Sequence, residues 1–201
     1  MPTSARRGRD LTPPTRPTSR EMRILVIGCC GSGKSTLARV IADRYGLPPI
    51  HLDQHYWRPG WVAPTDAEWR AQVERLAAKP RWVMDGNYSG TLPQRIAVAD
   101  AVVYLDMPRW LCLFRVLRRT VLGHGRPRAE VAPGCPERFD WKFILWVWNY
   151  PTRSRPKTLR LLETVSKPVV TLKSPAAVRD WLRNDMPLQG SRLLEECGQG
   201  R

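Results

Sequence analysis

The sequence lacks the cysteine pattern of a disulfide framework or of a zinc site. It contains five cysteines, an odd number, and no two of them have Cys-x-x-Cys spacing, although Cys29 and Cys30 are adjacent. Disulfides are rare in the reducing cytosol. We therefore expect a cytoplasmic protein whose fold depends on neither disulfides nor structural zinc.

A long hydrophobic run is also missing. A membrane-spanning helix needs about 20 consecutive apolar residues, whereas the most apolar stretch here, at 143–148, is bracketed by polar residues. We therefore expect no membrane association. Around this stretch Trp141, Leu145 and Trp148 recur at i, i+4 and i+7, which predicts a helix with these side chains facing the core.

The two ends of the chain have little apolar content. Residues 1–20 are basic and rich in Pro, Thr and Ser, without the apolar segment of a secretory signal. They are predicted to be a disordered basic arm, and residues 187–201 a mobile tail. The intervening 22–185 are long enough for one sizeable core, so we expect a single domain there.

Acidic residues are few. The 18 Asp and Glu face 33 Lys and Arg, which gives a formal net charge of +15. Much of the excess lies between residues 109 and 160, where twelve basic side chains face three acidic ones. Such a block can be a solvated face, a nucleic-acid patch or a set of clamps for nucleotide phosphates, and its position in the fold decides between them.

One motif has a specific chemistry. Residues 28–35 read GCCGSGKS and match G-x-x-x-x-G-K-[ST], between an apolar β-branched run at 23–27 and a helical pattern at 34–46 that places Leu37, Val40 and Ile41 on a buried face. Backbone N–H groups of such a loop cradle phosphates at a helix N-terminus. The motif predicts binding of ATP and Mg²⁺. The predicted nucleotide-binding residues of the loop are Gly28, Gly31, Ser32, Gly33, Lys34, Ser35 and Thr36, with Lys34 on the transferring phosphates and Ser35 on the metal.

Strand and helix patterns alternate along the rest of the chain. Five short apolar segments are predicted to be strands: 23–27, 49–53, 81–85, 101–106 and 167–174. Helical periodicity occurs between and after them, with a capping box at Thr65 and Glu68 and an N-cap at Ser174. The sequence therefore predicts the α/β class, with a five-stranded, mostly parallel sheet and helices on both faces.

Acidic residues at the predicted strand ends are candidate functional residues, because ligands of such sheets bind beyond the carboxyl ends of the strands. Asp85 either holds the Mg²⁺ shell or caps a turn with Gly86. Asp53 either orients and deprotonates an attacking hydroxyl or is structural. Asp106 occupies the equivalent place on the fourth strand, and His51 is interpreted as a hydrogen-bonded packing histidine.

Several blocks together resemble a known family. They are GCCGSGKSTLAR, HLD, WRPGW, RWVMDGNYS, AVVYLDMPRWLCLFRVLRRT, GRPR, GCPERFD and WVWNYPTRSRPK. Over residues 22–185 the chain resembles the adenylate-kinase-like P-loop kinases described as DNA topology modulation proteins. The resemblance implies a nucleoside-monophosphate-kinase-like fold, a magnesium-side carboxylate at Asp85 and an arginine-rich helical lid at about 115–157. In such a lid Arg119, Arg126, Arg128, Arg153 and Arg155 would close on the nucleotide phosphates, with Arg119, Arg153 and Arg155 acting in catalysis.

The sequence also departs from adenylate kinases proper. Asp85 and Gly86 are followed by Asn-Tyr-Ser rather than by a phenylalanine and the Pro-Arg pair whose arginine grips AMP, and the lid region has a single cysteine, Cys135. The acceptor therefore stays open. We expect a kinase that transfers the γ-phosphoryl group of ATP to a nucleotide or to another hydroxyl or phosphate acceptor. The alternative is a nucleic-acid-associated, NTP-dependent modulator of DNA topology or expression.

The basic arm generates a prediction of its own. Any nucleic-acid binding is expected to be weak, independent of sequence and strongly salt-dependent, because the basic arm is a solvated, flexible stretch that carries Arg6, Arg7, Arg9, Arg16 and Arg20. Deleting residues 1–20 should abolish this binding and leave ATP turnover unchanged, as measured by filter binding at several salt concentrations and by ADP release. Sequence-specific binding that survives the deletion would favour the alternative function.

Overall fold

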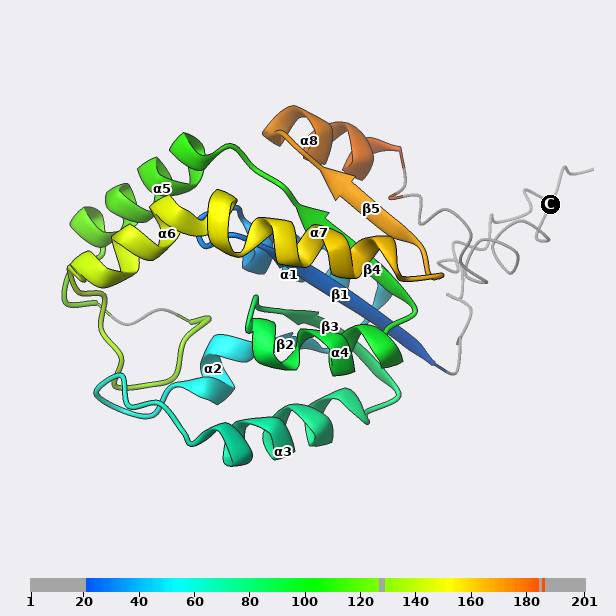
Figure 1. The fold of residues 1–201 in the computed structure, drawn as a ribbon, viewed down its shortest axis with the longest axis horizontal. Helices are drawn as coiled ribbons and strands as arrows, with labels where there is room; N and C mark the ends of the chain where they lie inside the picture. The colour runs from blue at the N-terminus through cyan, green and yellow to red at the C-terminus, as the bar shows by residue number, and fades with distance from the viewer. Residues whose placement is uncertain (1–20, 127–128, 185, 187–201) are drawn as a thin grey trace, which may run out of the picture.

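The computed structural model of the protein describes residues 21–126, 129–184 and 186 (Figure 1). The predicted basic arm, the predicted tail at 187–201 and Arg128 lie outside the described residues. Within the described residues the chain forms one five-stranded sheet with helices on both of its faces. No helix among them is both long and apolar enough to cross a membrane.

The sheet is parallel throughout. Its strands, in the spatial order β2-β3-β1-β4-β5, are β1 (Met22–Gly28), β2 (Pro49–His51), β3 (Arg81–Asp85), β4 (Ala101–Leu105) and β5 (Val169–Leu172). This order places the ends of β1 and β3 side by side, since Val26 is in register with Asp85. The predicted α/β class and parallel sheet are confirmed.

The end of the second strand differs from the prediction. The prediction that it continues to Asp53 is wrong, because β2 ends at His51 and a short helix begins at Leu52. Leu52 is fully buried, and its side chain fills the space that a Cβ on Gly86 would occupy. The chain turns into a helix here, which buries Leu52 under the end of β3 and moves Asp53 into the first helical turn.

The helices connect the strands. They are α1 (Lys34–Tyr45), α2 (Leu52–Tyr56), α3 (Asp66–Ala77), α4 (Leu92–Val98), α5 (Arg109–Leu122), α6 (Trp141–Arg153), α7 (Arg155–Glu163) and α8 (Pro175–Arg183), with a 3₁₀ turn η1 (Ser89–Thr91) before α4. The capping box of Thr65 and Glu68 and the Ser174 N-cap are confirmed. Both satisfy backbone N–H groups that a helix start would otherwise leave unpaired.

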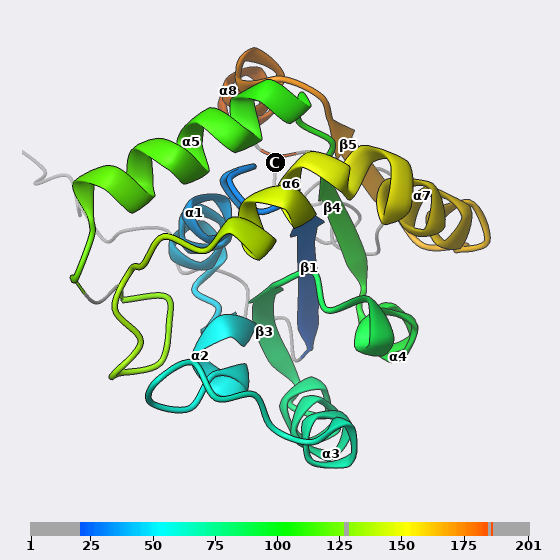
Figure 2. The same ribbon diagram turned by 60° about the vertical axis from the view of Figure 1, so that its left-hand side comes forward.

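Two apolar cores lie on opposite faces of the sheet. Alternate residues of β1 point to opposite sides, so Ile24 and Val26 enter one core and Leu25 and Ile27 the other. The first core is completed by α1, α5, α6 and α8, and the second by α3, α4 and α7. Figure 2 shows α1 and α5 on one side of the sheet and α4 and α7 on the other.

Two predicted buried faces are wrong in part. Trp141 and Leu145 of α6 are exposed, and the helix instead buries Ile144, Val147 and Tyr150. The reason is that α6 is apolar around most of its circumference, so a second stripe of suitable spacing faces inward, where the helix packs against α5 and α7. In α1, Leu37 and Ile41 are buried as predicted, whereas Val40 is 39% exposed.

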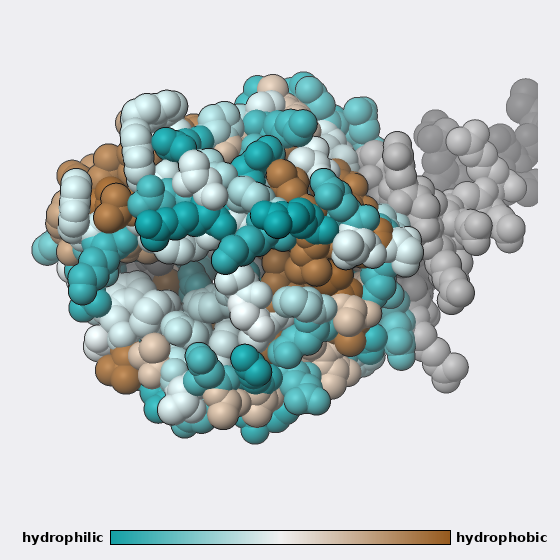
Figure 3. Space-filling model, in the orientation of Figure 1, coloured by the Kyte–Doolittle hydropathy of each residue, from teal (hydrophilic) through white to brown (hydrophobic). Residues whose placement is uncertain are grey.

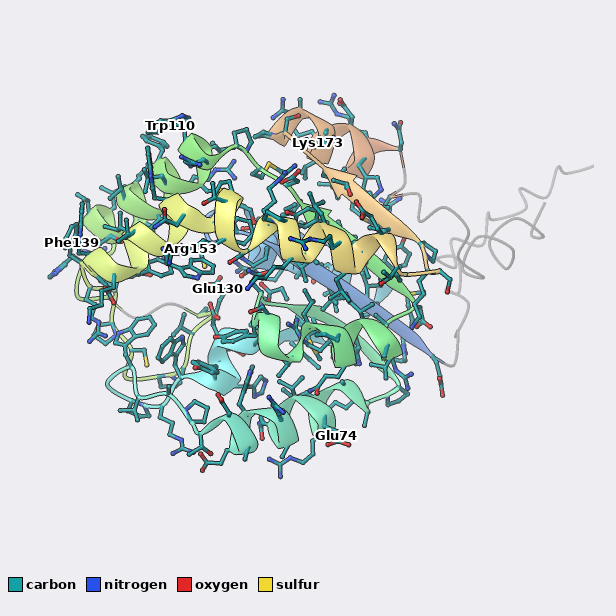
Figure 4. All side chains as sticks on the ribbon, in the orientation of Figure 1. Glu74, Trp110, Glu130, Phe139, Arg153 and Lys173 are labelled. Carbon is teal, nitrogen blue, oxygen red and sulfur yellow. The ribbon has the colours of Figure 1, made fainter. Side chains whose placement is uncertain are left out.

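Large hydrophobic side chains remain on the outer surface of α5 and around α6. Trp110, Phe114, Val121 and Leu122 are exposed there. Figure 3 shows hydrophobic residues gathered over this part of the molecule, and Figure 4 shows Trp110 and Phe139 at its outer edge. Only the inner face of α5 therefore contributes apolar side chains to the core, and the apolar side chains of its outer face are exposed.

The loop between β1 and α1, residues 29–33, is in close contact with α5. Gly31 has a φ of +79°, and a Cβ added to it would lie 2.3 Å from the carbonyl oxygen of Cys112. Only glycine allows both the left-handed backbone conformation and this approach. The contact fixes the position of α5 above the loop, which we call the glycine loop.

We predict that Gly31→Ala destabilises the protein by about 2 to 4 kcal/mol, because the added methyl group meets backbone atoms and the backbone is strained. Gly90→Ala is the matched control: Gly90 has no positive φ, and no heavy atom lies within 4 Å of its added Cβ. The control should change stability by less than about 0.5 kcal/mol. Urea unfolding of both variants checks this, and equal stabilities would contradict the contact.

Candidate active site

A cavity of about 250 Å³ lies at the carboxyl ends of β1 and β3, above the glycine loop. We call it the glycine-loop cavity. Its lining includes Gly31, Gly33, Lys34, Ser35, Thr36, Asp53, Asp85 and Arg119, all of which the sequence predicted as site residues. Gly28 and Ser32 were also predicted, but Gly28 ends β1 and Ser32 is 3% exposed, so these two shape the loop from below. The glycine loop and four elements, α1, α2, β3 and α5, therefore bring the eight lining residues to one place.

The floor of the cavity is the start of α1. Gly33 occupies the N-cap position and supplies no side-chain acceptor, so the first N–H groups of the helix have no side-chain cap. The Lys34 ammonium group donates a hydrogen bond of 2.9 Å to the carbonyl oxygen of Cys29, which holds it across the loop. A helix N-terminus and a lysine in this arrangement attract an anion such as a phosphate group.

Asp85 ends β3 at the edge of the cavity and is 3% exposed. Its Oδ1 is hydrogen-bonded to Nδ1 of His51 at 2.7 Å. This hydrogen bond raises the pKa of His51 above its ordinary value, against the opposing effect of burial. The geometry agrees with the interpretation of His51 as a hydrogen-bonded packing histidine, and that hydrogen bond orients the Asp85 carboxylate.

A magnesium ion would fit this donor set. Mg²⁺ prefers oxygen ligands and is usually held by one or two carboxylates together with substrate phosphates. The Ser35 hydroxyl and the Asp85 carboxylate line the same cavity. In the described part of the chain no cluster of three or more His, Cys, Asp or Glu side chains could hold a metal ion by itself. Phosphate oxygens and water molecules would therefore have to complete the coordination shell.

Asp53 approaches the cavity from the first turn of α2. Its Oδ1 accepts a 2.6 Å hydrogen bond from the Tyr88 hydroxyl. Burial, with the nearby Asp53 charge, raises the pKa of Tyr88 well above its ordinary value, so Tyr88 stays protonated and remains a donor. Tyr88, in the loop that follows Asp85, therefore holds the Asp53 carboxylate in place by this hydrogen bond.

A buried arginine holds that loop, residues 86–91. Arg95 of α4 has no exposed surface, and burial lowers the pKa of its guanidinium to about 9. The guanidinium donates to the carbonyl oxygens of Gly86 at 2.9 Å, Asn87 at 3.1 Å, Tyr88 at 2.9 Å and Thr91 at 3.3 Å. One side chain thereby satisfies four backbone acceptors and positions Asn87 and Tyr88 beside the cavity.

Two cavity arginines come from α5. Arg115 donates to the Gly31 and Ser32 carbonyl oxygens at 3.4 and 3.2 Å, and Arg119 is paired with Glu137 at 3.0 Å. The sequence analysis named Arg119 but not Arg115, although their i, i+4 spacing places both on one helix face. It also missed Arg39 of α1, whose guanidinium pairs with Glu130 at the cavity wall. Arg39 could have been found in the same way, four residues after Ser35.

The other predicted lid arginines are not brought to this cavity. Arg126 lines a neighbouring hollow together with Arg115 and Arg119. Arg153 is exposed on α6. Arg155 forms two 2.7 Å hydrogen bonds to Asp106, which hold the pKa of that carboxyl below its ordinary value. The catalytic roles of Arg153 and Arg155 stay predictions, and so does the role of Arg128.

A second cavity, of about 410 Å³, adjoins the first. We call it the aromatic cavity, because Tyr56, Trp57, Trp61, Tyr88, Phe143 and Trp146 line it. Asp53, Asn87 and Arg119 line both cavities. The sequence analysis did not anticipate this space, although WRPGW contributes two of its rings.

Comparisons with known proteins bear on the fold. No protein-family model matches the chain, and no curated protein is similar to it at a significant level. Among solved structures, the shikimate kinase from Acinetobacter baumannii in complex with shikimate is 15% identical, with a TM-score of 0.55 over 90% of this chain and 97% of that one. The shikimate kinase from Bacteroides thetaiotaomicron is 14% identical, with a TM-score of 0.51 over 87% and 98%.

These likenesses confirm the nucleoside-monophosphate-kinase-like α/β fold that the family resemblance implied. They extend over nearly the whole length of both solved kinases. The narrower resemblance to the DNA topology modulation proteins is tested by none of them and stays a prediction.

We predict that Arg95→Met lowers stability by about 3 kcal/mol, since it leaves buried carbonyl oxygens without a donor at nearly constant side-chain volume. Arg70→Met, at an exposed position of α3, is the control and should be nearly neutral. Guanidinium unfolding measures both. A loss in Arg95→Met no larger than in the control would mean that the four hydrogen bonds contribute nothing.

Proposed function

We propose that the protein is an ATP-dependent phosphotransferase that transfers the γ-phosphoryl group to a small-molecule hydroxyl acceptor. The observation that carries the proposal is the convergence of Lys34, Asp85 and Asp53 on one cavity at a helix N-terminus, together with two arginines of α5. The P-loop kinase fold, found in two solved shikimate kinases, supports it. A cytoplasmic location is part of the same proposal.

The first task of the site is to hold the nucleotide. The N–H groups of the glycine loop and of the first turn of α1 would bind the phosphates, and the Lys34 ammonium would move from the Cys29 carbonyl to a phosphate oxygen. Ser35 and Asp85 would hold Mg²⁺ against the phosphates. The ion would neutralise charge on the phosphate oxygens during transfer.

The second task is the transfer itself. The hydroxyl oxygen of the acceptor forms a bond to the γ-phosphorus of ATP while Asp53 accepts the hydroxyl proton. At the same time the bond between the γ-phosphorus and the bridging oxygen breaks, and ADP leaves with that oxygen. Tyr88 holds the carboxylate by its Oδ1. Arg115 and Arg119 stabilise the negative charge that spreads over the transferring group.

The arginine block supports this function over the nucleic-acid alternative. Arg115 and Arg119 line the cavity above the glycine loop, and Arg155 pairs with Asp106 at the end of β4. These three arginines are only partly exposed and are directed at the cavity or at a carboxylate, so the phosphate-clamp interpretation of the block accounts for them.

Three substitutions separate the proposed roles. Lys34→Ala should weaken ATP binding by about tenfold or more, because it removes the cation next to the phosphates. Asp85→Asn should depress turnover about a hundredfold and remove the response to added Mg²⁺. Asp53→Asn should keep ATP affinity and lose transfer to the acceptor. Calorimetry gives the affinities, and ADP release in the presence of acceptors gives turnover.

The matched control is Asp180→Asn, an exposed carboxylate of α8 outside both cavities. It should behave as the unmodified protein does. Full transfer activity in Asp53→Asn would make Asp53 structural. Unchanged ATP affinity in Lys34→Ala, together with unchanged turnover in Asp85→Asn, would refute the proposed function.

A further inference from the structure

We infer that the aromatic cavity binds the acceptor, and that the acceptor is a hydroxyl-bearing molecule with a planar ring system and without a phosphate or carboxylate group. This inference rests on the proposed function and specifies its substrate class. Four kinds of observation carry it: the continuity of the two cavities, the rings of the walls, the charge of the lining and an unpaired amide oxygen.

The two cavities are continuous at the residue proposed to activate the acceptor. Asp53, Asn87 and Arg119 line both of them. A molecule in the aromatic cavity therefore presents a hydroxyl to Asp53 while the phosphates lie on the other side of the same carboxylate. This is the arrangement that in-line transfer requires.

The first wall is built from α2 and the segments around it. Tyr56 and Trp57 follow Asp53 by three and four residues, so helical geometry places their rings next to its carboxylate. Tyr56 contacts Trp57 edge to face at 4.8 Å between ring centroids and Tyr88 at 4.6 Å, and Trp57 contacts Trp61 at 5.3 Å. These rings brace one another into a rigid apolar surface.

The second wall is α6. Phe143 and Trp146 lie one turn apart, with ring planes only 8° from parallel and centroids 6.3 Å apart. Both line the same cavity as the α2 rings. Parallel aromatic side chains are a stacking surface for a flat ring, and stacking of a base on one aromatic side chain is typically worth a factor of about ten in affinity.

The charges of the lining disfavour an anion. Two cations, Arg119 and Arg138, are outnumbered by three carboxylates, Asp53, Glu137 and Asp140. Arg119 is paired with Glu137, and the Arg138 guanidinium lies over the ring of Trp61 at 5.7 Å. A phosphate or carboxylate group on the acceptor would therefore approach more negative than positive side chains.

The glycine-loop cavity has the opposite balance. Four cationic side chains, Lys34, Arg39, Arg115 and Arg119, face three carboxylates in its lining. The phosphate-binding character thus belongs to one cavity and the ring-binding character to the other. An acceptor that is neutral or positively charged would therefore favour the aromatic cavity, and the phosphates of ATP would favour the glycine-loop cavity.

Asn87 offers a polar contact where the cavities meet. Its Oδ1 is buried and has no hydrogen-bond partner among the described residues. A buried unpaired acceptor is costly unless a ligand supplies a donor. A hydroxyl or ring N–H group of the acceptor would satisfy it, next to Asp53.

The test measures acceptor binding by calorimetry in the absence of ATP. The probes are matched pairs that differ only in a phosphate group: adenosine with AMP, thymidine with TMP, and pyridoxine with pyridoxine phosphate. Gluconate and shikimate serve as anions without an aromatic ring. At least one unphosphorylated ring compound should bind about tenfold or more tightly than its phosphorylated partner. Tighter binding of the phosphorylated members, or of the ring-free acids, overturns the inference.

Variants test the two walls and the charge separately. Trp146→Ala should weaken binding of the ring compound about tenfold, whereas Trp110→Ala, on the outer surface of α5, should not change it. Asp140→Asn keeps an N-cap side chain on α6 and removes one negative charge, so the preference over the phosphorylated partner should fall about threefold. Asp180→Asn should leave that preference unchanged. Equal effects in each variant and its control would refute the assignment.

Failure of the inference and failure of the proposed function give different results. If ring compounds bind with the expected selectivity but receive no phosphoryl group from ATP, the proposed function fails and the binding site stands. If ATP phosphorylates only anionic or ring-free hydroxyl compounds, the inference fails and the proposed function stands.

Discussion

The approach of the glycine loop to α5 is the constraint on which the site depends. Gly31 touches the backbone of Cys112 as closely as a residue without a Cβ can. Because α5 is fixed at that point, Arg115 and Arg119, one and two helical turns further on, are carried over the start of α1. Gly31, which the proposed function assigns to phosphate binding, thereby also sets the distance between the sheet and the arginines.

A second anchor works from the opposite side of the cavity. The Arg95 guanidinium organises the loop after β3 through four carbonyl oxygens, and Tyr88 of that loop in turn holds Asp53 on α2. Desolvating a guanidinium is expensive, and the hydrogen bonds offset much of that cost only if all of them form. The carboxylate side of the site is therefore held as one unit, and it faces the arginines that α5 supplies.

The sequence predicted the parts whose chemistry depends on local spacing. The glycine loop, the strand that ends on Asp85 and the helix caps at Thr65 and Ser174 are such parts. Asp53 does line the cavity, as the sequence predicted, but it lies on a helix and not at the end of a strand. The helix could not be predicted, because no local signal reveals that Leu52 is buried against Gly86. The face of α6 could not be predicted, since an almost wholly apolar helix offers several stripes, and tertiary contacts choose among them. The arginines that reach the cavity could not be predicted either, because their positions depend on partners that are distant in sequence. Arg155, for example, is hydrogen-bonded to Asp106 and does not line the cavity.

The walls of the aromatic cavity lie on α2, on the segment after it and on α6, whereas the residues proposed to bind the phosphates lie on the sheet, the glycine loop and α1. Trp57, Trp61 and Trp146 are also only partly buried, so exchanging them removes less core packing than exchanging a strand residue would. Under the proposed assignment of the two cavities, acceptor choice can therefore be altered by substitutions that cost little folding free energy, whereas the residues around the glycine loop belong to the tightly packed part of the molecule.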